Sequence, residues 1–114
     1  MGTVTVGQDA CATEGSAHPA MEEVELASVL HALSDPVRLR IVCTLAARGE
    51  LPCGAIDLPV VKSTCTHHFR VLREAGLIRQ RTEGTTKLNS LRREDLDARF
   101  PGLLSAVLAE SPVA

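Results

Sequence analysis

The sequence predicts one mainly α-helical domain with a small β-hairpin, in the order helix, helix, helix, helix, hairpin, helix. The chain of 114 residues is long enough for a single domain. It contains two Phe and no Trp or Tyr, so its core must be aliphatic, which suits packed helices. Residues 62–91 have the pattern of a helix that stops at a glycine and continues directly into a two-stranded hairpin.

The first 20 residues are rich in small side chains without periodicity, and we expect them to form a mobile arm before a domain over 21–110 and a tail over 111–114. The first helix is expected over 21–33. A second helix is expected over 36–47. Asp35 can cap it, and Pro36 suits its first position.

A short third helix is expected over 53–58, where Pro52 and Pro59 limit its length. The fourth helix should begin at a Ser63 cap and run to Ala75. Gly76 then stands where a left-handed residue commonly ends a helix.

The hairpin is predicted to have strands over 77–82 and 86–91, around a tip formed by Glu83, Gly84 and Thr85. A last helix is expected over 92–110. Pro101 lies inside it and should kink or split it.

Charge is segregated along the chain. Residues 62–93 contain eight basic and two acidic side chains, a net charge of +6, whereas the rest of the chain sums to −8. The mildly acidic total therefore hides a strongly basic segment, which favours binding to nucleic acid.

The basic segment combines a helix that carries a hydroxyl and histidine face with a hairpin that carries arginines. This combination suits reading of the DNA major groove and contact with neighbouring phosphates. The partner is therefore expected to be double-stranded operator DNA. The candidate contact residues are Lys62, Ser63, Thr64, Thr66, His67, Arg70, Arg79, Arg81 and Lys87. His68 is equally suited to DNA contact and to a structural hydrogen bond.

Other classes of function fit the sequence poorly. The scarcity of aromatic residues argues against single-stranded nucleic acid or RNA, which proteins usually bind by stacking. The chain has no GxSxG, P-loop or HExxH motif, so we expect no enzyme. It also has no apolar run long enough for a membrane span and no secretory signal pattern, so we expect a cytoplasmic protein with no membrane partner.

Two segments, LSDPVRLRIV at 33–42 and KSTCTHHFRVLREAGLI at 62–78, resemble the signature segments of ArsR/SmtB-type winged helix-turn-helix repressors. The EGT hairpin tip and the amphipathic last helix fit as well, so the resemblance covers roughly 24–108. It implies a homodimer in which the first and last helices pack across a two-fold axis. The expected interface residues are Val24, Leu30, Phe100, Leu104 and Val107.

Members of that family respond to a metal, a metalloid or a redox signal, but this chain departs from their known sites. Where one group of sensors has ELCVCDL, this chain has ELPCGAI, with Cys53 as the single cysteine. The last helix has no histidine for a zinc site. The sequence therefore requires no cofactor, and thiol oxidation competes with zinc or nickel as the signal. The candidate sensing residues are Cys53, which would start a helix whose dipole activates the thiol, and its partners Cys11, His18, His31 and Cys43.

Two of these partners also have a plainer interpretation, because Cys43 is expected to be a small core residue and His31 a surface or interface histidine. The alternative function is a winged-helix protein-interaction module, a co-regulator that senses no ligand itself. The +6 segment argues against it, since a protein-docking surface does not need such a charge.

Overall fold

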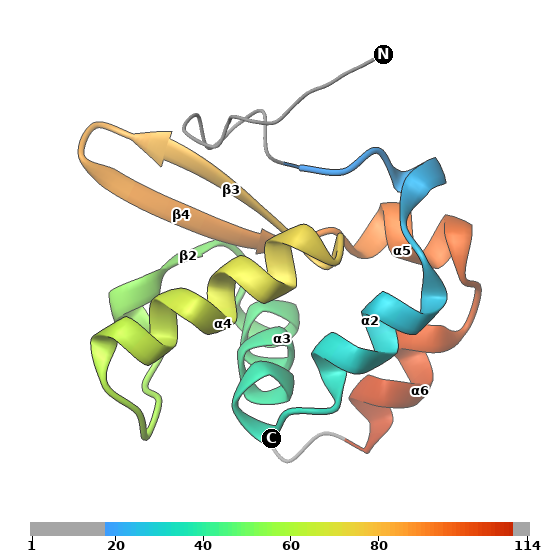
Figure 1. Cartoon of the computed structure of the whole chain (residues 1–114), viewed down its shortest axis with the longest axis horizontal. Helices are drawn as coiled ribbons and strands as arrows, with labels where there is room; N and C mark the ends of the chain where they lie inside the picture. Colours follow the sequence, from blue (N-terminus) through green and yellow to red (C-terminus); the bar gives the residue numbers. More distant parts are fainter. Residues whose placement is uncertain (1–17, 111–114) are drawn as a thin grey trace.

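The computed structural model describes residues 18–110 (Figure 1). The tail, most of the expected N-terminal arm and the candidate ligand Cys11 lie outside the described residues. The elements, in order, are η2 Met21–Glu23, α2 Leu26–Leu33, α3 Pro36–Arg48, β2 Leu51–Pro52, η3 Cys53–Ala55, α4 Lys62–Glu74, β3 Ile78–Glu83, β4 Thr86–Leu91, α5 Arg93–Arg99 and α6 Leu103–Ala109. The expected mainly helical fold with one hairpin is confirmed.

The first helix is shorter than predicted. Residues 21–23 form one 3₁₀ turn, the backbone is extended at Val24, and α2 begins only at Leu26. The break turns the Val24 side chain inward against Gly76, and only 3% of Val24 stays exposed. The expectation that Val24 lies in a dimer interface is therefore wrong, because the core of the protomer already covers it.

The start of α3 agrees with the prediction. Asp35 is the N-cap, its Oδ1 accepts hydrogen bonds from the backbone N–H groups of Val37 at 2.8 Å and Arg38 at 3.2 Å, and Pro36 occupies the first helical position. Burial raises the pKa of the Asp35 carboxyl, but these hydrogen bonds and the nearby charges outweigh it, so the pKa lies below its usual value. The helix ends at Arg48 with Gly49 as its C-cap, one residue later than predicted.

The predicted helix over 53–58 is wrong. Leu51 and Pro52 instead pair with Asn89 and Leu88 as a third strand, followed by the single 3₁₀ turn of η3. The chain then becomes extended and buries Ile56 in the core, which prevents a longer helix.

The predicted Ser63 cap is also wrong. Helix α4 begins two residues earlier than that cap implies, because the carbonyl of Val61 accepts the hydrogen bond from the Cys65 N–H that closes the first turn. Val61 is thus the N-cap, and no side chain caps the helix.

Helix α4 passes into the hairpin through a tight glycine turn. Gly76 has a φ of +90°, its N–H donates to the carbonyl of Arg73, and the N–H of Leu77 donates to the carbonyl of Leu72. This pair of bonds is a Schellman motif, and it satisfies the carbonyls at the helix end. The glycine stop predicted from the sequence is confirmed.

The hairpin forms as predicted, except that its first strand begins and ends one residue later than expected. Strands β3 and β4 pair antiparallel from Ile78 with Leu91 to Glu83 with Thr86, around a turn at Gly84 and Thr85. Strand β2 pairs with β4, which makes a three-stranded sheet in the order β2-β4-β3. The hairpin projects beyond the helices, and we call it the wing (Figure 1).

The last helix is split into α5 and α6, as Pro101 suggested. Gly102, with a φ of +85°, is the left-handed residue at which the chain turns before α6. The turn brings α6 back onto the body, where Leu104 is only 1% exposed within a core shared by the helices and the base of the sheet. The assignment of Leu104 to a dimer interface is therefore wrong. No helix among residues 18–110 is long and apolar enough to cross a membrane.

Candidate nucleic-acid interface

Helix α4 has a buried face and an exposed polar face. Phe69 and Leu72 point into the core and are at most 2% exposed. Thr66, His67 and Arg70 are exposed. They share one side of the helix, because Arg70 follows Thr66 by four residues and His67 by three. Lys62 and Ser63 are also exposed and Thr64 is half-buried, so the predicted helix contacts are accessible except that Thr64 is partly covered.

His68 is a structural residue of this helix. It is 7% exposed, and its Nδ1 lies 3.2 Å from Nη1 of Arg38. Because a guanidinium can only donate, Nδ1 must accept, which makes the ring neutral with its proton on Nε2. The question that the sequence left open for His68 is thereby decided in favour of the structural hydrogen bond.

Arg38 is one of the residues that sequence reasoning missed. Its Nε donates to the carbonyl of Ala32 at 2.8 Å and its Nη2 to that of His31 at 3.4 Å, so one side chain joins the end of α2, α3 and α4. The carbonyl end of a helix attracts a cation, which helps to offset the cost of burying this charge. A signal was present in the sequence, because Arg38 lies three residues before Ile41 on the apolar face of its helix.

The burial of His68 beside Arg38 should make stability depend on pH. Burial lowers the pKa of His68 below its usual 6.5; Asp35 opposes this shift, while the Arg38 and His67 charges add to it. As the pH falls below about 6.5, the unfolded chain takes up a proton that the folded chain resists, so stability is full above 6.5 and is lost below it.

We expect His68→Gln to reduce this loss, because glutamine can still accept from Arg38 but does not titrate. Urea unfolding of both proteins at pH 8 and pH 5.5, at one protein concentration, measures the effect. The other histidines are common to both proteins and cancel. Equal loss of stability in the two proteins would show that His68 does not cause it.

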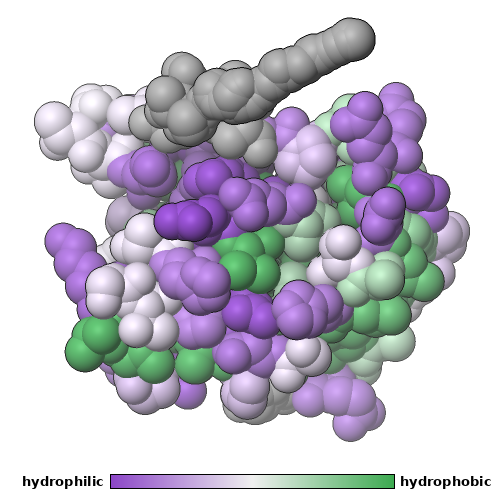
Figure 2. All heavy atoms as spheres, in the orientation of Figure 1, coloured by the Kyte–Doolittle hydropathy of each residue, from purple (hydrophilic) through white to green (hydrophobic). Residues whose placement is uncertain are grey.

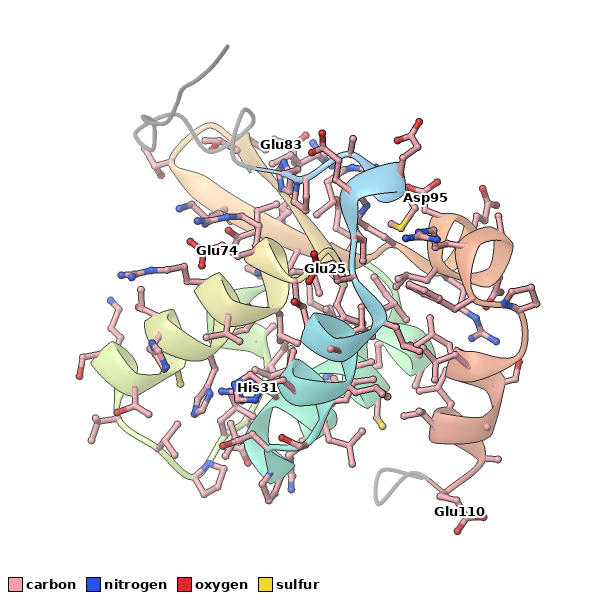
Figure 3. All side chains as sticks on the ribbon, turned by 45° about the vertical axis from the view of Figure 1, so that its right-hand side comes forward. Glu25, His31, Glu74, Glu83, Asp95 and Glu110 are labelled. Atoms are coloured by element: carbon pink, nitrogen blue, oxygen red, sulfur yellow. The ribbon has the colours of Figure 1, made fainter. Side chains whose placement is uncertain are left out.

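The wing carries three basic side chains whose surroundings differ. Arg81 donates from Nε and Nη2 to the two carboxylate oxygens of Glu50, at 2.9 and 2.8 Å. Arg79 lies 3.3 Å from Asp95, beside the base of the wing (Figure 3). Lys87 is exposed near the tip and has no carboxylate within ion-pair distance among residues 18–110. Of the three candidate contact residues on the wing, Lys87 is thus the one that lacks a carboxylate partner in the described part of the chain.

A partly buried chain of polar groups connects the wing to α4. Nη1 of Arg73 donates to Oε1 of Gln80 at 2.9 Å, and Nε2 of Gln80 donates to Oδ1 of Asn89 at 2.6 Å. Nδ2 of Asn89, a residue with no exposed surface, then lies 3.2 Å from both Sγ of Cys53 and the carbonyl of Leu51. Sequence reasoning missed this network, although the predicted hairpin already placed two amide side chains on opposite strands.

Within residues 18–110, the candidate sensing residues do not come together as a metal site. Cys53 is half-buried in η3, whose three residues are too few to activate a thiol by a helix dipole, so that argument was wrong. His18 Nε2 accepts a hydrogen bond from the β3 backbone at 2.8 Å, and His31 is exposed on α2 (Figure 3). Cys43 is a core residue, as expected. The described residues contain no group of three or more metal-binding side chains with suitable geometry.

An apolar surface remains on α2 and α6. Leu26 and Leu30 are 45% and 47% exposed, and Phe100 and Val107 are half-buried. Hydrophobic side chains reach the surface on this side of the molecule (Figure 2). A groove of about 370 Å³ runs between the two helices, lined by Leu30, Leu33, Ser34, Leu39, Ala106, Val107 and Glu110.

Comparisons with known proteins agree with this geometry. Residues 33–81 match the family model of a helix-turn-helix domain. The chain is 42% identical over 84 residues to the uncharacterized HTH-type transcriptional regulator YceK of Bacillus subtilis, covering 71% of this chain and 84% of the relative.

Two solved structures are also similar. The transcriptional repressor BigR from Xylella fastidiosa has 30% identity and a TM-score of 0.55, with 65% of this chain and 78% of that chain covered. The ArsR family transcriptional regulator RHA00566 has 25% identity and a TM-score of 0.57, with 75% and 89% covered.

Proposed function

Because the chain belongs to the ArsR family of winged helix-turn-helix transcriptional regulators, which bind DNA and are not enzymes, we propose that it is a dimeric repressor of a palindromic operator. The observation that carries the proposal is the exposed polar face of α4 beside the wing, within a segment of net charge +6. Two copies related by a two-fold axis would present two such helices to two half-sites of an operator.

We assign different tasks to α4 and the wing. Thr64, Thr66, His67 and Arg70 lie on the side of α4 that can enter the major groove, where hydroxyl, imidazole and guanidinium groups can bond to base edges. We assign phosphate contacts to Lys62, Ser63 and the wing cations Arg79, Arg81 and Lys87. Such contacts position the protein but carry no sequence information.

This division predicts two kinds of variant. Lys87→Ala should weaken binding to every duplex alike and reduce the slope of log K against log salt by about 0.9, the contribution of one phosphate contact. His67→Ala should reduce affinity for a duplex selected from a random pool more than affinity for random DNA. Fluorescence anisotropy with both duplexes at several salt concentrations measures both effects.

Two outcomes would count against the assignment. Identical behaviour of the two variants would show that the division between helix and wing is wrong. Failure of the wild-type protein to bind any duplex in a salt-dependent way would favour the alternative of a protein-docking co-regulator.

For the dimer, we propose the α2 and α6 surface as the contact between copies. Its support is the exposed Leu26 and Leu30 beside the apolar groove between these helices. Burial of such a surface against a second copy stabilises association through the hydrophobic effect.

For the signal, we propose that Cys53 is the point at which an inducer acts. An oxidant such as peroxide would transfer one oxygen atom to the Cys53 sulfur and release water, giving a sulfenic acid. Zinc or nickel would instead need further ligands, for which Cys11, His18, His31 and Cys43 are the candidates. The support is the contact of Cys53 with Asn89, from which hydrogen bonds continue through Gln80 to Arg73 on α4.

Through this network a change at the Cys53 sulfur can shift the position of α4 relative to the wing. A coupling free energy of about 1–3 kcal/mol between the signal and DNA binding is typical of such regulation.

We expect Cys53→Ser to abolish the response of DNA binding to whichever of zinc, nickel, arsenite or peroxide acts on the wild type. Serine keeps a hydrogen-bonding group near Asn89 but cannot form a sulfenic acid or a thiolate–metal bond. Cys65→Ser is the matched control, because Cys65 is the other half-buried thiol among the described residues. A Cys53→Ser protein that responds like the wild type would show that the signal enters elsewhere.

A further inference from the structure

We propose that Glu50 occupies the place of a DNA phosphate on the wing, so that Glu50 and the operator compete for the guanidinium of Arg81. Glu50 would then limit the affinity of the regulator for all duplexes. The inference rests on the proposed contact between the wing and DNA, and it assigns a role to a residue that the sequence analysis did not place in the interface.

The two residues meet across the sheet. Glu50 directly precedes β2 and Arg81 lies in β3, with β4 between them. Leu88 of β4 stands opposite both Pro52 of β2 and Arg81 of β3, and Glu50 is two residues before Pro52. Because side chains two residues apart on a strand share a face, Glu50 and Arg81 lie on the same side of the sheet. Their bond therefore crosses the central strand.

The bond has the geometry that a guanidinium also uses for phosphate. Both carboxylate oxygens of Glu50 accept, from Nε at 2.9 Å and from Nη2 at 2.8 Å. The third nitrogen, Nη1, lies 3.7 Å from the carboxylate of Glu83. With its fork filled in this way, Arg81 cannot hold a phosphate in the same bidentate manner until Glu50 leaves.

The hydrogen bond from Arg81 lowers the pKa of Glu50 below its usual value, so Glu50 is a carboxylate at neutral pH. The pair is nevertheless open to exchange. The Arg81 side chain is 50% exposed and that of Glu50 is 33% exposed, and ion pairs in contact with water are held weakly. A phosphate placed beside the wing by contacts from α4 can therefore take over the guanidinium.

The decisive variant is Glu50→Gln, which has nearly the same shape but removes the charge. We expect it to bind both selected and random duplexes more tightly than the wild type. Its slope of log K against log salt should be steeper by about 0.9, because Arg81 becomes available to one more phosphate. Its advantage over the wild type should accordingly shrink about 3.5-fold between about 50 mM and about 200 mM salt.

Two controls separate this mechanism from a general change in charge. Glu94→Gln removes the same charge from an exposed position on α5, and it should leave the slope unchanged. The double variant Glu50→Gln/Arg81→Ala should lose the gain that Glu50→Gln shows over the wild type, because the gain acts through Arg81. Thermal unfolding of each variant verifies that the fold is intact, and Glu50→Ala repeats the test if the glutamine variant unfolds.

Three results would overturn the inference: an unchanged slope in Glu50→Gln, a gain that persists in the double variant, or weaker binding by Glu50→Gln. Weaker binding would mean that the ion pair between Glu50 and Arg81 instead stabilises the wing in the shape that binds DNA. These outcomes differ from failure of the proposed function, in which the wild-type protein itself would show no salt-dependent binding to duplex DNA.

Discussion

Leu104→Asp should unfold the protomer rather than only separate a dimer. Leu104 is 1% exposed in the core, and a carboxylate without a partner at such a position costs roughly 3–5 kcal/mol. That is a large fraction of the roughly 5–15 kcal/mol by which small domains are stable. Urea unfolding followed by circular dichroism should show a strongly lowered midpoint or no folded baseline.

Leu30→Asp is the matched comparison on the other side of the same apolar region. Leu30 is 47% exposed, so an aspartate there stays in water within one protomer and should leave its fold intact. If α2 and α6 form the interface, this variant should sediment as a folded monomer at a concentration where the wild type is a dimer. A folded Leu104→Asp monomer together with a dimeric Leu30→Asp protein would reverse the assignment of core and interface.

Gly76→Ala should be the most damaging of the glycine substitutions. The residue has a φ of +90°, and a Cβ there would lie 2.5 Å from Cγ2 of Val24. The left-handed backbone costs an L residue about 1–2 kcal/mol and overpacking adds about 1–3 kcal/mol, so we expect a loss of roughly 2–5 kcal/mol. Because Gly76 joins α4 to the wing, DNA binding should fall along with stability.

Gly84→Ala separates the cost of the left-handed backbone from the cost of the steric contact. Gly84 also has a positive φ, of +65°, but a Cβ there meets nothing within 4 Å. It should therefore cost only the backbone term of about 1–2 kcal/mol. Equal losses of unfolding free energy in the two variants would show that Val24 moves aside and that the contact carries no cost.

Local features of the fold were predictable because they depend on neighbouring residues. The Asp35 cap, the proline at the start of α3, the glycine stop after α4 and the hairpin were all expected, and the structure contains them. The mistakes at 21–33 and 53–58 have a different origin. Distant contacts decide both segments, because Val24 packs against Gly76, and Leu51 and Pro52 pair with a strand far along the chain.

In the candidate site, too, features set by neighbouring residues were predictable and contacts between distant residues were not. The sequence indicated which side of α4 is polar, because that follows from helical spacing alone. It did not indicate that His68 is held by Arg38, or that Arg81 is held by Glu50, since these partners are 30 and 31 residues apart. The availability of a charged group for DNA therefore depends on contacts that no local pattern contains.

The sequence by itself determined the order of most elements, the polar face of α4, the basic segment and the family. Only the tertiary structure decided that Val24 and Leu104 are core residues, that Leu30 stays exposed, and that Cys53 contacts Asn89 beneath the wing. The physical reason is that an apolar pattern requires a helix face to be buried but does not specify which surface buries it. Whether the same protomer or a second copy provides it depends on where the chain returns in space.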